Sequence, residues 1–444
     1  MRMGAAHTGQ DLDPTTQENA MSTALSRRQF AGLATATAAT AAMTAPAGAA
    51  TVTPQTIATG PNAVALKKAL QSTIGRPVVG AVCSVSGKYG RMDIAAGRFS
   101  LGRKELAREN ARARISSMTK PHVATAVLEL VEKGTWSLKT TIDDVLPGLW
   151  KGRGRVTIGQ LLNHTSGMPD HINDYVTRYV EEHGFTLDWW EDFTNDQWTH
   201  AKIIREAKKL PWHFAPGTGW SYSNTGYVVL GMMLEKVYRK PIDKVLRERI
   251  YTRMNMNQTF LFNSAKVENP KLQLEDVAIL GKRKERLEKN NLSIFSASAA
   301  AMATSADITD FWALLMRHKV LSRTMVDRMI TPVGAAKEAQ AGYGVFVLDD
   351  VWTGKGKVYG HDGGGFGSSA MSFTSRDGWR RMAFMMTGRP YDEQSNLLLD
   401  GQAKVMDACM AVSTNRSGRP KGYSAAAVRR EVMPMLQRSA FRIG

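Results

Sequence analysis

The chain has 444 residues, of which 43% are hydrophobic and 22% are charged, and its formal net charge is +18. These proportions are ordinary for a globular protein that buries a substantial core, and the length allows one large domain or two to three smaller ones. No stretch approaches the ~20 strongly apolar residues that a membrane-spanning helix needs, so we expect no transmembrane span.

The N-terminus carries the ordered features of an export signal. Ser26-Arg27-Arg28-Gln29-Phe30 is a twin-arginine pattern, a weakly apolar Ala/Thr-rich run covers residues 31–45, and Ala47-Gly48-Ala49 suits signal peptidase. The other interpretation is a disordered Ala-rich tail with a chance arginine pair. The order of the three features favours a twin-arginine signal peptide over residues 1–49 and a protein that is exported, either periplasmic or secreted.

The excess positive charge belongs to the part of the chain that follows this signal. Residues 1–49 hold three arginines against three acidic residues, so residues 50–444 keep the whole +18. For an exported protein, this charge predicts electrostatic association with an anionic cell envelope, through its polymers or its lipid headgroups. We expect no nucleic-acid partner, because no recognisable nucleic-acid-binding motif accompanies the charge.

After the signal, the first elements alternate between helix and strand. Residues 63–71 predict a short helix, and residues 77–86, which are rich in β-branched side chains, predict a strand. A turn then leads to a second strand over residues 92–96. From residue 118 apolar side chains recur at helical spacing, and Gly134 supplies a stop for that helix.

The middle of the chain reads as helical. Residues 140–290 are mostly helix and loop segments separated by prolines and glycines. The charged run of residues 282–289 is most simply a solvated loop or helix face. Thr304 or Ser305 is expected to cap a helix that runs to about residue 318.

Strand signals return toward the C-terminus. Residues 343–348 predict one strand, and residues 368–374 and 380–387 predict a hairpin around the two-residue turn Asp377-Gly378. Residues 395–412 then predict a helix. Strands near both ends with helices between them indicate one sheet built from the two ends of the chain.

These elements predict an α/β fold. An antiparallel sheet from N- and C-terminal strands, flanked by helices, would occupy residues 50–117 and 291–412, with a mostly helical domain, residues 118–290, inserted. Residues 413–444 form a basic tail. Its apolar residues suggest a membrane-surface helix, but Pro434 and the weak apolar face favour self-docking or disorder.

Three further groups of residues have a structural and a functional interpretation. Cys83 and Cys409 lie in apolar runs, so two buried thiols are favoured over a disulfide. His164, Asp170 and His171 resemble metal ligands, but no His-Glu-x-x-His helix exists and we expect no metal and no cofactor. The aromatic residues between the two main motifs are expected as core of the helical domain or as loop anchors, rather than as a substrate wall: Trp189, Trp190, Phe193, Trp198, Trp212 and Trp220.

Ser117 and Lys120 form the strongest catalytic signal. A serine at the start of a helix exposes its hydroxyl beside unpaired backbone N–H groups, and a lysine three residues on lies on the same face. A serine needs a base to become a nucleophile, and a lysine acts as a base only when it is neutral. Burial and nearby cations can lower its pKa far enough. Tyr222 is the other candidate base, and the residues leave this choice open.

Asn224 and the segment after His361 complete the predicted site. Asn224 follows Tyr222 by two residues, so in an extended segment both side chains point the same way, and the amide could hold the lysine. His361 is interpreted as a cation that shares the proton. The glycines after it allow a strand to approach the substrate closely, so Gly363 and Gly364 are expected to bind substrate. The N–H of Gly364 would form an oxyanion hole with that of Ser117.

Together these motifs resemble one known family. In their order and spacing over roughly residues 63–412 they are similar to the class C β-lactamase, D-alanyl-D-alanine carboxypeptidase and esterase group of penicillin-recognising serine hydrolases. The resemblance implies a β-lactamase/transpeptidase-like fold and the nucleophile, base and oxyanion roles given above. The motifs are Arg114-Ile115-Ser116-Ser117-Met118-Thr119-Lys120, Leu161-Leu162-Asn163-His164-Thr165-Ser166-Gly167, Pro216-Gly217, Tyr222-Ser223-Asn224-Thr225-Gly226-Tyr227 and Tyr359-Gly360-His361-Asp362-Gly363-Gly364.

Two departures bear on the substrate. Carboxypeptidases of this group hold a terminal carboxylate with an arginine on the strand before the histidine, whereas this strand reads Val347-Leu348-Asp349-Asp350, and Asp362 stands where they have a hydroxyl residue. The sequence therefore predicts a serine hydrolase of amides or esters, carboxypeptidase- or β-lactamase-like, acting on small molecules or peptidoglycan peptides. The alternatives are a small-molecule esterase or D-amino-acid amidase, and a non-hydrolytic penicillin-binding envelope protein.

Overall fold

The structure is a computed structural model that describes residues 61–87, 90–262, 272–287, 290–414 and 424–436. All of these residues belong to one compact unit of the chain. The predicted signal peptide and residues 415–423 and 437–444 of the predicted basic tail lie outside the described residues, so the predictions for these residues stay untested. Within the described part of the chain, no helix is long and apolar enough to cross a membrane.

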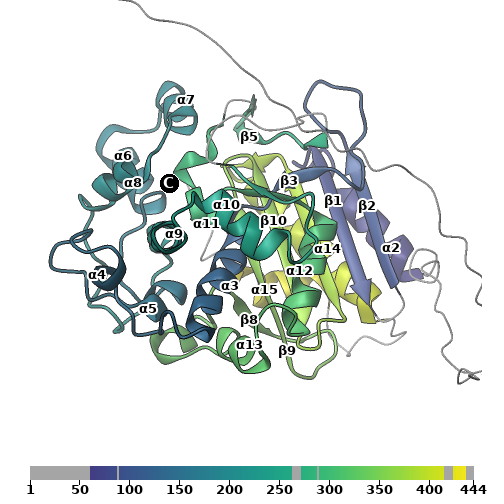
Figure 1. Cartoon of the computed structure of the whole chain (residues 1–444). Coiled ribbons are helices and arrows are strands. Elements are labelled where there is room, and N and C mark those ends of the chain that lie inside the picture. Colours follow the sequence, from purple (N-terminus) through teal and green to yellow (C-terminus); the bar gives the residue numbers. More distant parts are fainter. Residues whose placement is uncertain (1–60, 88–89, 263–271, 288–289, 415–423, 437–444) are drawn as a thin grey trace, which may run out of the picture. The chain divides into compact units, whose positions relative to one another are not determined.

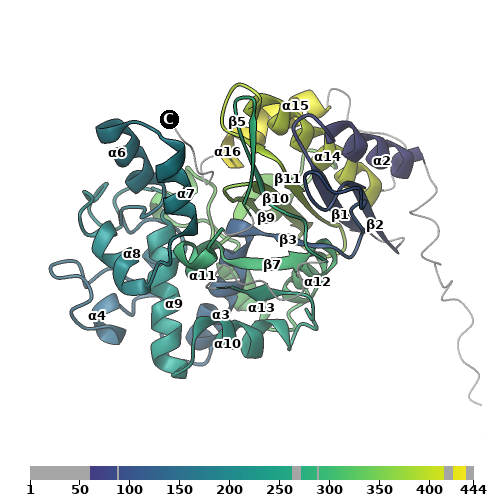
Figure 2. The ribbon, with the colours of Figure 1, turned by 90° about the horizontal axis from the view of Figure 1, so that it is seen from above.

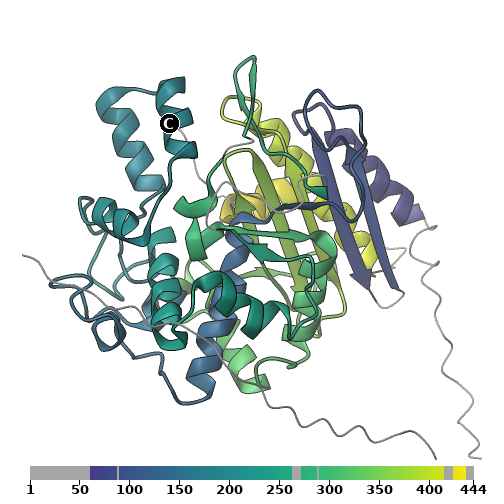
Figure 3. The same cartoon turned by 45° about the horizontal axis from the view of Figure 1, so that its top comes forward.

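A six-stranded sheet forms the centre of this unit, with the strand order β2-β1-β11-β10-β9-β8 (Figure 1). Every neighbouring pair is antiparallel. The first two strands of the chain lie beside the last long ones, purple against yellow-green in Figure 3. The predicted sheet from the two ends of the chain is therefore confirmed. Its strands are β1 (Gly80–Gly87), β2 (Gly90–Gly97), β8 (Phe346–Asp349), β9 (Lys357–Gly364), β10 (Ser368–Ser375) and β11 (Arg381–Thr387).

Burial along the strands follows from their place in the sheet. Every residue of β1 is buried, as expected for an inner strand that is covered on both faces. In β2, Met92, Ile94 and Ala96 are buried while their neighbours are partly exposed. This alternation is that of an edge strand with a single covered face.

Helices cover both faces of the sheet (Figure 2). On one face lie α2 (Pro61–Thr73), α14 (Ser395–Thr414) and α15 (Ala425–Glu431), and on the other lies α12 (Ser305–Met316). The helices predicted over residues 63–71 and 395–412 are thus confirmed. So is the predicted cap, because the Thr304 side chain accepts a hydrogen bond from the N–H of Asp307 at the start of α12.

The C-terminal tail docks on the chain's own core where the structure describes it. Val428 and Val432 are buried at 0% and 3% exposure, and they join the hydrophobic cluster that α14 forms with the sheet. The short helix α16 (Met433–Leu436) follows. Self-docking, rather than a membrane-surface helix, accounts for the apolar positions of residues 424–434.

Of the remaining helices, α4 to α9 lie on the left of Figure 1, and α3, α10, α11 and α13 lie nearer its centre. Trp190, Phe193 and Trp198 are buried among them, and Trp189 and Trp212 pack partly buried against the same cluster, as predicted. Trp190 also contacts Phe366, just after β9, with ring centroids 5.0 Å apart. These helices are α3 (Thr119–Glu132), α4 (Ile142–Val145), α5 (Ile158–Leu162), α6 (Asn173–His183), α7 (Leu187–Asn195), α8 (His200–Ala207), α9 (Asn224–Tyr238), α10 (Ile242–Leu246), α11 (Ser296–Ala299) and α13 (Arg323–Met329).

One prediction about the middle of the chain is corrected by a short strand. Residues 283–286 of the charged run form strand β6, which pairs with β5 (Val277–Leu280) across a turn at Gly281, where φ is +64°. The run is mostly exposed, as expected, but its pairing with β5 makes it a strand rather than a loop or a helix face. The second small sheet joins β4 (Phe260–Leu261) to β7 (Ala301–Thr304) and β3 (Arg112–Arg114).

The hairpin of β10 and β11 is confirmed, but its loop is longer than the two-residue turn predicted. The N–H of Ser375 donates to the carbonyl of Arg380 at 2.9 Å, so residues 376–379 form the connection. The side chain of Asp377 accepts from the Ser375 hydroxyl and from the N–H of Trp379. These local hydrogen bonds stabilise the wider loop.

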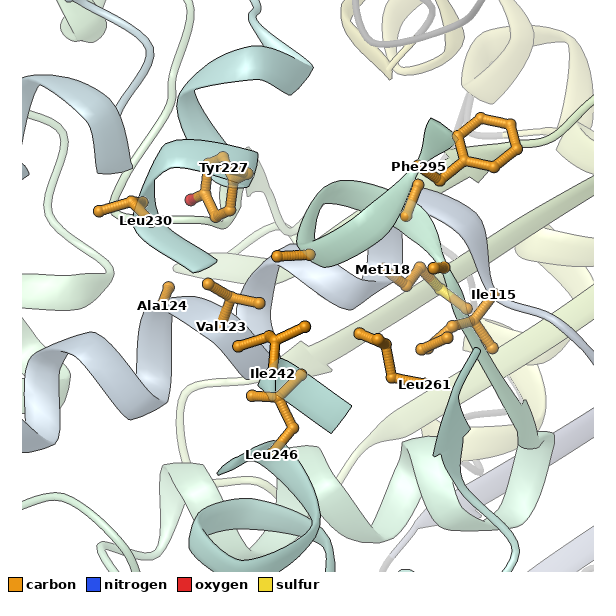
Figure 4. Packing of buried hydrophobic residues seen from close by; sticks show 14 of the residues in the cluster. Ile115, Met118, Val123, Ala124, Tyr227, Leu230, Ile242, Leu246, Leu261 and Phe295 are labelled. Carbon is orange, nitrogen blue, oxygen red and sulfur yellow. The ribbon is translucent and has the colours of Figure 1, made fainter. Parts of the chain in front are cut away.

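One hydrophobic cluster joins the helices to the sheet. It contains Val82 and Ala370 of the sheet together with Val228 of α9, and part of it is drawn in Figure 4. Met118, Val123 and Ala124 at the start of α3 pack in this cluster, which fixes the end of α3 that carries the predicted site. The division into a sheet domain and a helical domain stays a prediction.

The two cysteines lie in the second cluster, between the sheet and α14. Cys83 of β1 and Cys409 of α14 are both fully buried and unbridged, with their Sγ atoms 3.4 Å apart. The predicted pair of buried thiols is the state that the structure has.

Candidate active site

The structure brings all five predicted catalytic residues together. Ser117 lies in the 3₁₀ turn Ser116–Met118, and Lys120 in the first turn of α3 that follows it. Tyr222 comes from the loop before α9, Asn224 is the first residue of α9, and His361 lies on β9. Each of these side chains belongs to a residue no more than 6% exposed.

The turn that carries the serine is held in an unusual backbone conformation. Ser116 has a φ of +47°, which is costly for a residue with a side chain. The hydroxyl of Thr119 donates to the Ser116 carbonyl at 2.7 Å and accepts from the N–H of Ala301 at 3.1 Å. The turn is thereby tied to β7, which compensates the strain and places Ser117 at the end of the helix.

Lys120 makes three polar contacts that divide by chemistry. Its Nζ atom lies 2.7 Å from Oδ1 of Asn224 and 3.0 Å from the carbonyl oxygen of Ser298, and both of these groups only accept. The third contact, at 3.3 Å, is Oγ of Ser117, which can donate. A neutral amine has two N–H bonds and one lone pair, so this arrangement directs the lone pair at the serine hydroxyl.

The electrostatics favour that neutral form. Burial lowers the pKa of Lys120 to about 7, although the carboxylates of Asp170 and Asp362 oppose the shift. The cation also sits at the positive end of the α3 dipole, which disfavours it. At pH 7 a substantial fraction of Lys120 is therefore neutral.

His361 is neutral too, which corrects its interpretation as a cation. Burial, with the nearby charge of Lys120, lowers its pKa to about 3. Its Nδ1 lies 2.5 Å from the carbonyl oxygen of Asp362, and since a carbonyl only accepts, Nδ1 carries the hydrogen. The Nε2 atom is left as an acceptor, and the ring packs on Phe346 at a centroid distance of 4.8 Å.

Tyr222 has the opposite electrostatics from Lys120. Burial, with a smaller contribution from Asp362, raises the pKa of its hydroxyl well above 10 even though Ser117 lies close enough to favour the ionised form. Its ring stacks on His164 at 4.3 Å, and Lys120 Nζ lies 4.7 Å from the ring centre. Of the two candidate bases, burial thus favours the neutral amine and disfavours the phenolate.

The C-terminal half of β9 runs close to the turn that carries Ser117, as the glycines predicted. β8 pairs with β9 only up to Gly360, so beyond this residue β9 pairs with β10 on one side in the part of the chain described. A Cβ atom on Gly363 would lie 2.4 Å from the Ile115 carbonyl and 3.2 Å from the Ser117 nitrogen. Only glycine allows this strand to run so close to the serine turn.

The sequence missed three residues that the site uses or adjoins. Asp170 accepts hydrogen bonds from Asn224, and Ser298 accepts from Lys120 through its backbone. Arg389, from strand β12 (Arg389–Pro390), donates to the Gly365 carbonyl, and a Cβ on Gly364 would lie 2.7 Å from its Nη1. Only Asp170 had a sequence signal, since it follows the motif Leu161–Gly167 and resembles a metal ligand there.

The residues that resembled metal ligands have other partners. His171 contacts the Ile294 carbonyl at 2.7 Å and the Thr225 hydroxyl at 3.1 Å, and His164 accepts from the N–H of Ser223. Over the described ranges, no three His, Cys, Asp or Glu side chains are placed to hold a metal ion.

The fold and the matches to known proteins place the chain among serine hydrolases that act on amides or esters. The Beta-lactamase family model matches residues 68–432, and the chain belongs to that family.

Known relatives span several names within this class. The chain is 23% identical to "Penicillin-binding protein 4*" of Bacillus subtilis over 330 residues, 70% of this chain and 68% of that protein. It is 33% identical to "Esterase EstB" of Burkholderia gladioli over 142 residues, 30% of this chain and 34% of that protein. A solved D-stereospecific amidohydrolase from Streptomyces superposes with a TM-score of 0.65 at 28% identity, covering 78% of this chain and 97% of that chain.

Proposed function

We propose that this protein hydrolyses amides or esters through an acyl-enzyme on Ser117, with Lys120 as the base. Neutral Lys120 takes the hydroxyl proton as Ser117 Oγ bonds to the substrate's carbonyl carbon. The N–H groups of Ser117 and Gly364 hold the resulting oxyanion. The C–N or C–O bond then breaks, and the leaving group takes the proton from Lys120 through the Tyr222 hydroxyl. Water repeats the sequence on the acyl-serine and releases the acid.

One observation carries this proposal: the contacts of Lys120 Nζ. Two acceptor-only oxygens, from Asn224 and Ser298, occupy its two N–H bonds, and the serine hydroxyl faces the remaining lone pair. The pKa of about 7 agrees with a base that works near neutrality. In this arrangement Asn224 aligns the lysine, and His361, held by its Nδ1–H, presents an acceptor nitrogen near Tyr222.

The substrate that this site supports best has no free carboxylate beside the scissile bond. Asp362 belongs to β9, its side chain is 11% exposed, and its negative charge reaches both Lys120 and Tyr222. A substrate carboxylate placed there would be repelled, whereas an amino group would be attracted. We therefore propose a D-amino-acid amide, or a small ester, as substrate. The 28% identity to a D-stereospecific amidohydrolase supports the first, and the partial match to an esterase the second.

A D-alanyl-D-alanine carboxypeptidase, or a β-lactamase-like activity, is the second candidate. The likeness to penicillin-binding protein 4* supports it, and Arg389 offers a cation beside Gly364 that β8 lacks. A penicillin-binding protein that acylates and stalls would share the same Ser117 chemistry. Stable labelling without turnover separates it from a hydrolase.

The place of action is also part of the proposal. The twin-arginine pattern and the +18 charge support an exported protein that associates with an anionic cell envelope. Replacing Arg27 and Arg28 with lysines is expected to leave the protein inside the cell. Export of that variant at the normal level, measured by cell fractionation, would contradict the signal assignment.

Intact-mass spectrometry and a substrate panel test the proposed function together. The wild type and Ser117→Ala are compared on benzylpenicillin, D-phenylalanine amide, its N-acetyl derivative, p-nitrophenyl acetate and a peptide ending in D-Ala-D-Ala. Turnover of the D-amide or the ester, lost in Ser117→Ala, supports the first candidate. Peptide turnover or a lasting penicilloyl mass shift supports the second. Activity that survives in Ser117→Ala would overturn the nucleophile.

A further inference from the structure

Asp170 lies next to the catalytic centre without touching Ser117 or Lys120 in the hydrogen-bond network. It sits in the loop before α6, and only 1% of its surface is exposed. Its Oδ1 accepts from the N–H groups of Ile172 and Asn173, at 2.8 and 3.1 Å. Its Oδ2 accepts from Asn224 twice, from the backbone N–H at 3.0 Å and from Nδ2 at 2.8 Å, and from Nδ2 of Asn173 at 3.2 Å.

This set of donors requires a carboxylate. Both oxygens of an ionised carboxylate accept, so one side satisfies the loop and the other satisfies Asn224. An asparagine at the same place has one accepting oxygen and one donating NH₂ group. It would leave either the loop or Asn224 facing a donor, and a buried donor without an acceptor is costly.

The contact also decides which way the Asn224 amide points. Because Nδ2 of Asn224 donates to Asp170, Oδ1 is the atom that faces Lys120, at 2.7 Å. A reversed amide would turn its NH₂ group toward Lys120, and the lysine would lose one of its two acceptors. The orientation that leaves the lysine lone pair for Ser117 therefore depends on Asp170.

Asp170 acts on the charge of Lys120 as well. Two carboxylates favour the protonated lysine against burial, and the effect of Asp170 on the pKa of Lys120 is larger than that of Asp362. The remaining titratable groups around Lys120 come from the loops before α6 and α9, from α9 itself and from β9. They are His164, His171, Tyr222, Tyr227 and His361.

We propose that Asp170 is a positioning residue of this hydrolase, which orients the Asn224 amide toward Lys120 and sets the pH at which the lysine becomes an active base. The inference rests on the proposed function, because it acts through the lysine base. It adds a residue that contacts neither the nucleophile nor its base by a hydrogen bond.

Asp170→Asn tests the inference, with Asp174→Asn as the matched control. Asp174 lies four residues on and accepts from the backbone N–H of Asp170 at 2.7 Å, but it contacts His213 rather than Asn224. For Asp170→Asn we expect kcat to fall about 100-fold with KM changed little, as for a misplaced catalytic group. The acid limb of the pH profile of kcat/KM should move about one unit lower, because a carboxylate that favours the lysine cation is gone. Asp174→Asn should stay within about twofold of the wild type with an unmoved limb.

A charge swap keeps the test decisive if Asp170→Asn fails to fold. Asn224→Asp alone places two carboxylates in contact and should be nearly inactive. In the double variant Asp170→Asn/Asn224→Asp, the new amide can donate to the new carboxylate, whose other oxygen accepts from Lys120, while the backbone N–H of residue 224 loses its acceptor. We expect the double variant to be at least about tenfold more active than Asn224→Asp. Its acid limb should lie at higher pH than that of the wild type, because a carboxylate would then contact Lys120 directly.

The outcomes separate the inference from the proposed function. A wild type that is acylated at Ser117, with Asp170→Asn equal to Asp174→Asn in kcat and in the acid limb, overturns the inference alone. So does a folded double variant no more active than Asn224→Asp. Activity that persists in Ser117→Ala would instead remove the proposed function.

Discussion

The two ends of helix α3 each bury a charged side chain, with opposite results. Lys120, at the first turn, is 0% exposed and meets a hydroxyl and two neutral oxygens, so burial drives it toward its neutral form. Glu129, near the last turn, is 3% exposed. Burial would raise its pKa, but hydrogen bonds and charges from Arg249, Lys133 and Arg253 outweigh burial and lower it.

The difference lies in the partners, although Glu129 is also less deeply buried than Lys120. Each end of the helix holds the charge that its dipole disfavours, a cation at the N-terminus and an anion near the C-terminus. Three cations compensate the Glu129 carboxylate: Lys133 at 2.9 Å, Arg253 at 2.8 Å, and Arg249. Lys120 has only neutral dipoles in hydrogen-bond contact, and the carboxylates of Asp170 and Asp362 act on it through their charge. A buried charge is thus stable where full opposite charges surround it, and reactive where they do not.

The largest expected effect comes from removing the charge at each end. Lys120→Met should lower kcat/KM by at least about 10³-fold, because the serine loses its base. Its Tm should equal or exceed that of the wild type, since a buried cation is replaced by an apolar side chain. Glu129→Gln should keep activity within about threefold. Steady-state kinetics and thermal melts check both, and an active Lys120→Met variant would remove the lysine from the mechanism.

The pH dependence of activity and of stability should follow the protonation of Lys120. The base works only when neutral, so kcat/KM should fall about tenfold per pH unit below pH 7, the pKa of Lys120. For stability, the unfolded lysine binds a proton more tightly than the folded one. Stability should therefore rise from about pH 7 toward the ordinary lysine pKa, and this rise should be absent in Lys120→Met. A pH–rate profile flat down to pH 5 would contradict the assignment.

Glu129 should affect stability with the opposite pH window. Its folded pKa lies below the ordinary value, so its contribution is present above about pH 4.5 and is lost as the pH falls through the folded pKa. Glu129→Gln should cost about 1–2 kcal/mol at pH 7, because its partners are half-exposed and water screens them. Denaturant unfolding at pH 7 and at pH 3 measures the difference, which should narrow at the lower pH.

Salt gives the smallest effect and the sharpest contrast. The partners Lys133 and Arg253 are 51% and 38% exposed, so 0.5 M NaCl should lower the contribution of the Glu129 cluster to stability by about 0.3 kcal/mol. Lys120 is inaccessible to ions, and its acid limb should not move. A limb that shifts with salt as strongly as the stability does would show that solvent reaches the lysine.

Most of the candidate site could be predicted because its chemistry lies in short, local patterns. Ser117 and Lys120 are one helical turn apart, and Tyr222 and Asn224 flank a capping serine, so local geometry alone places each pair. The glycines after His361 indicated a close approach, and Gly363 shows where that approach is made, against Ile115. The main strands and flanking helices followed from periodicity in the same way.

The errors share a cause in burial and in distant contacts. His361 was expected to be a cation, and its burial beside Lys120 makes it neutral. Residues 283–286 were expected in a loop or helix, and pairing with β5 makes them a strand. Ser298 could not be found from its side chain, because it contacts Lys120 through its carbonyl oxygen.

Local sequence patterns indicated which residues could do chemistry, because nucleophile, base, amide and glycine run are residue types at recognisable spacings. The proposal of Lys120 as the base and the proposed role of Asp170 rest on contacts that only the fold creates. A pKa depends on how much water the fold removes and on which charges it brings from elsewhere in the chain, and neither quantity is contained in a local pattern.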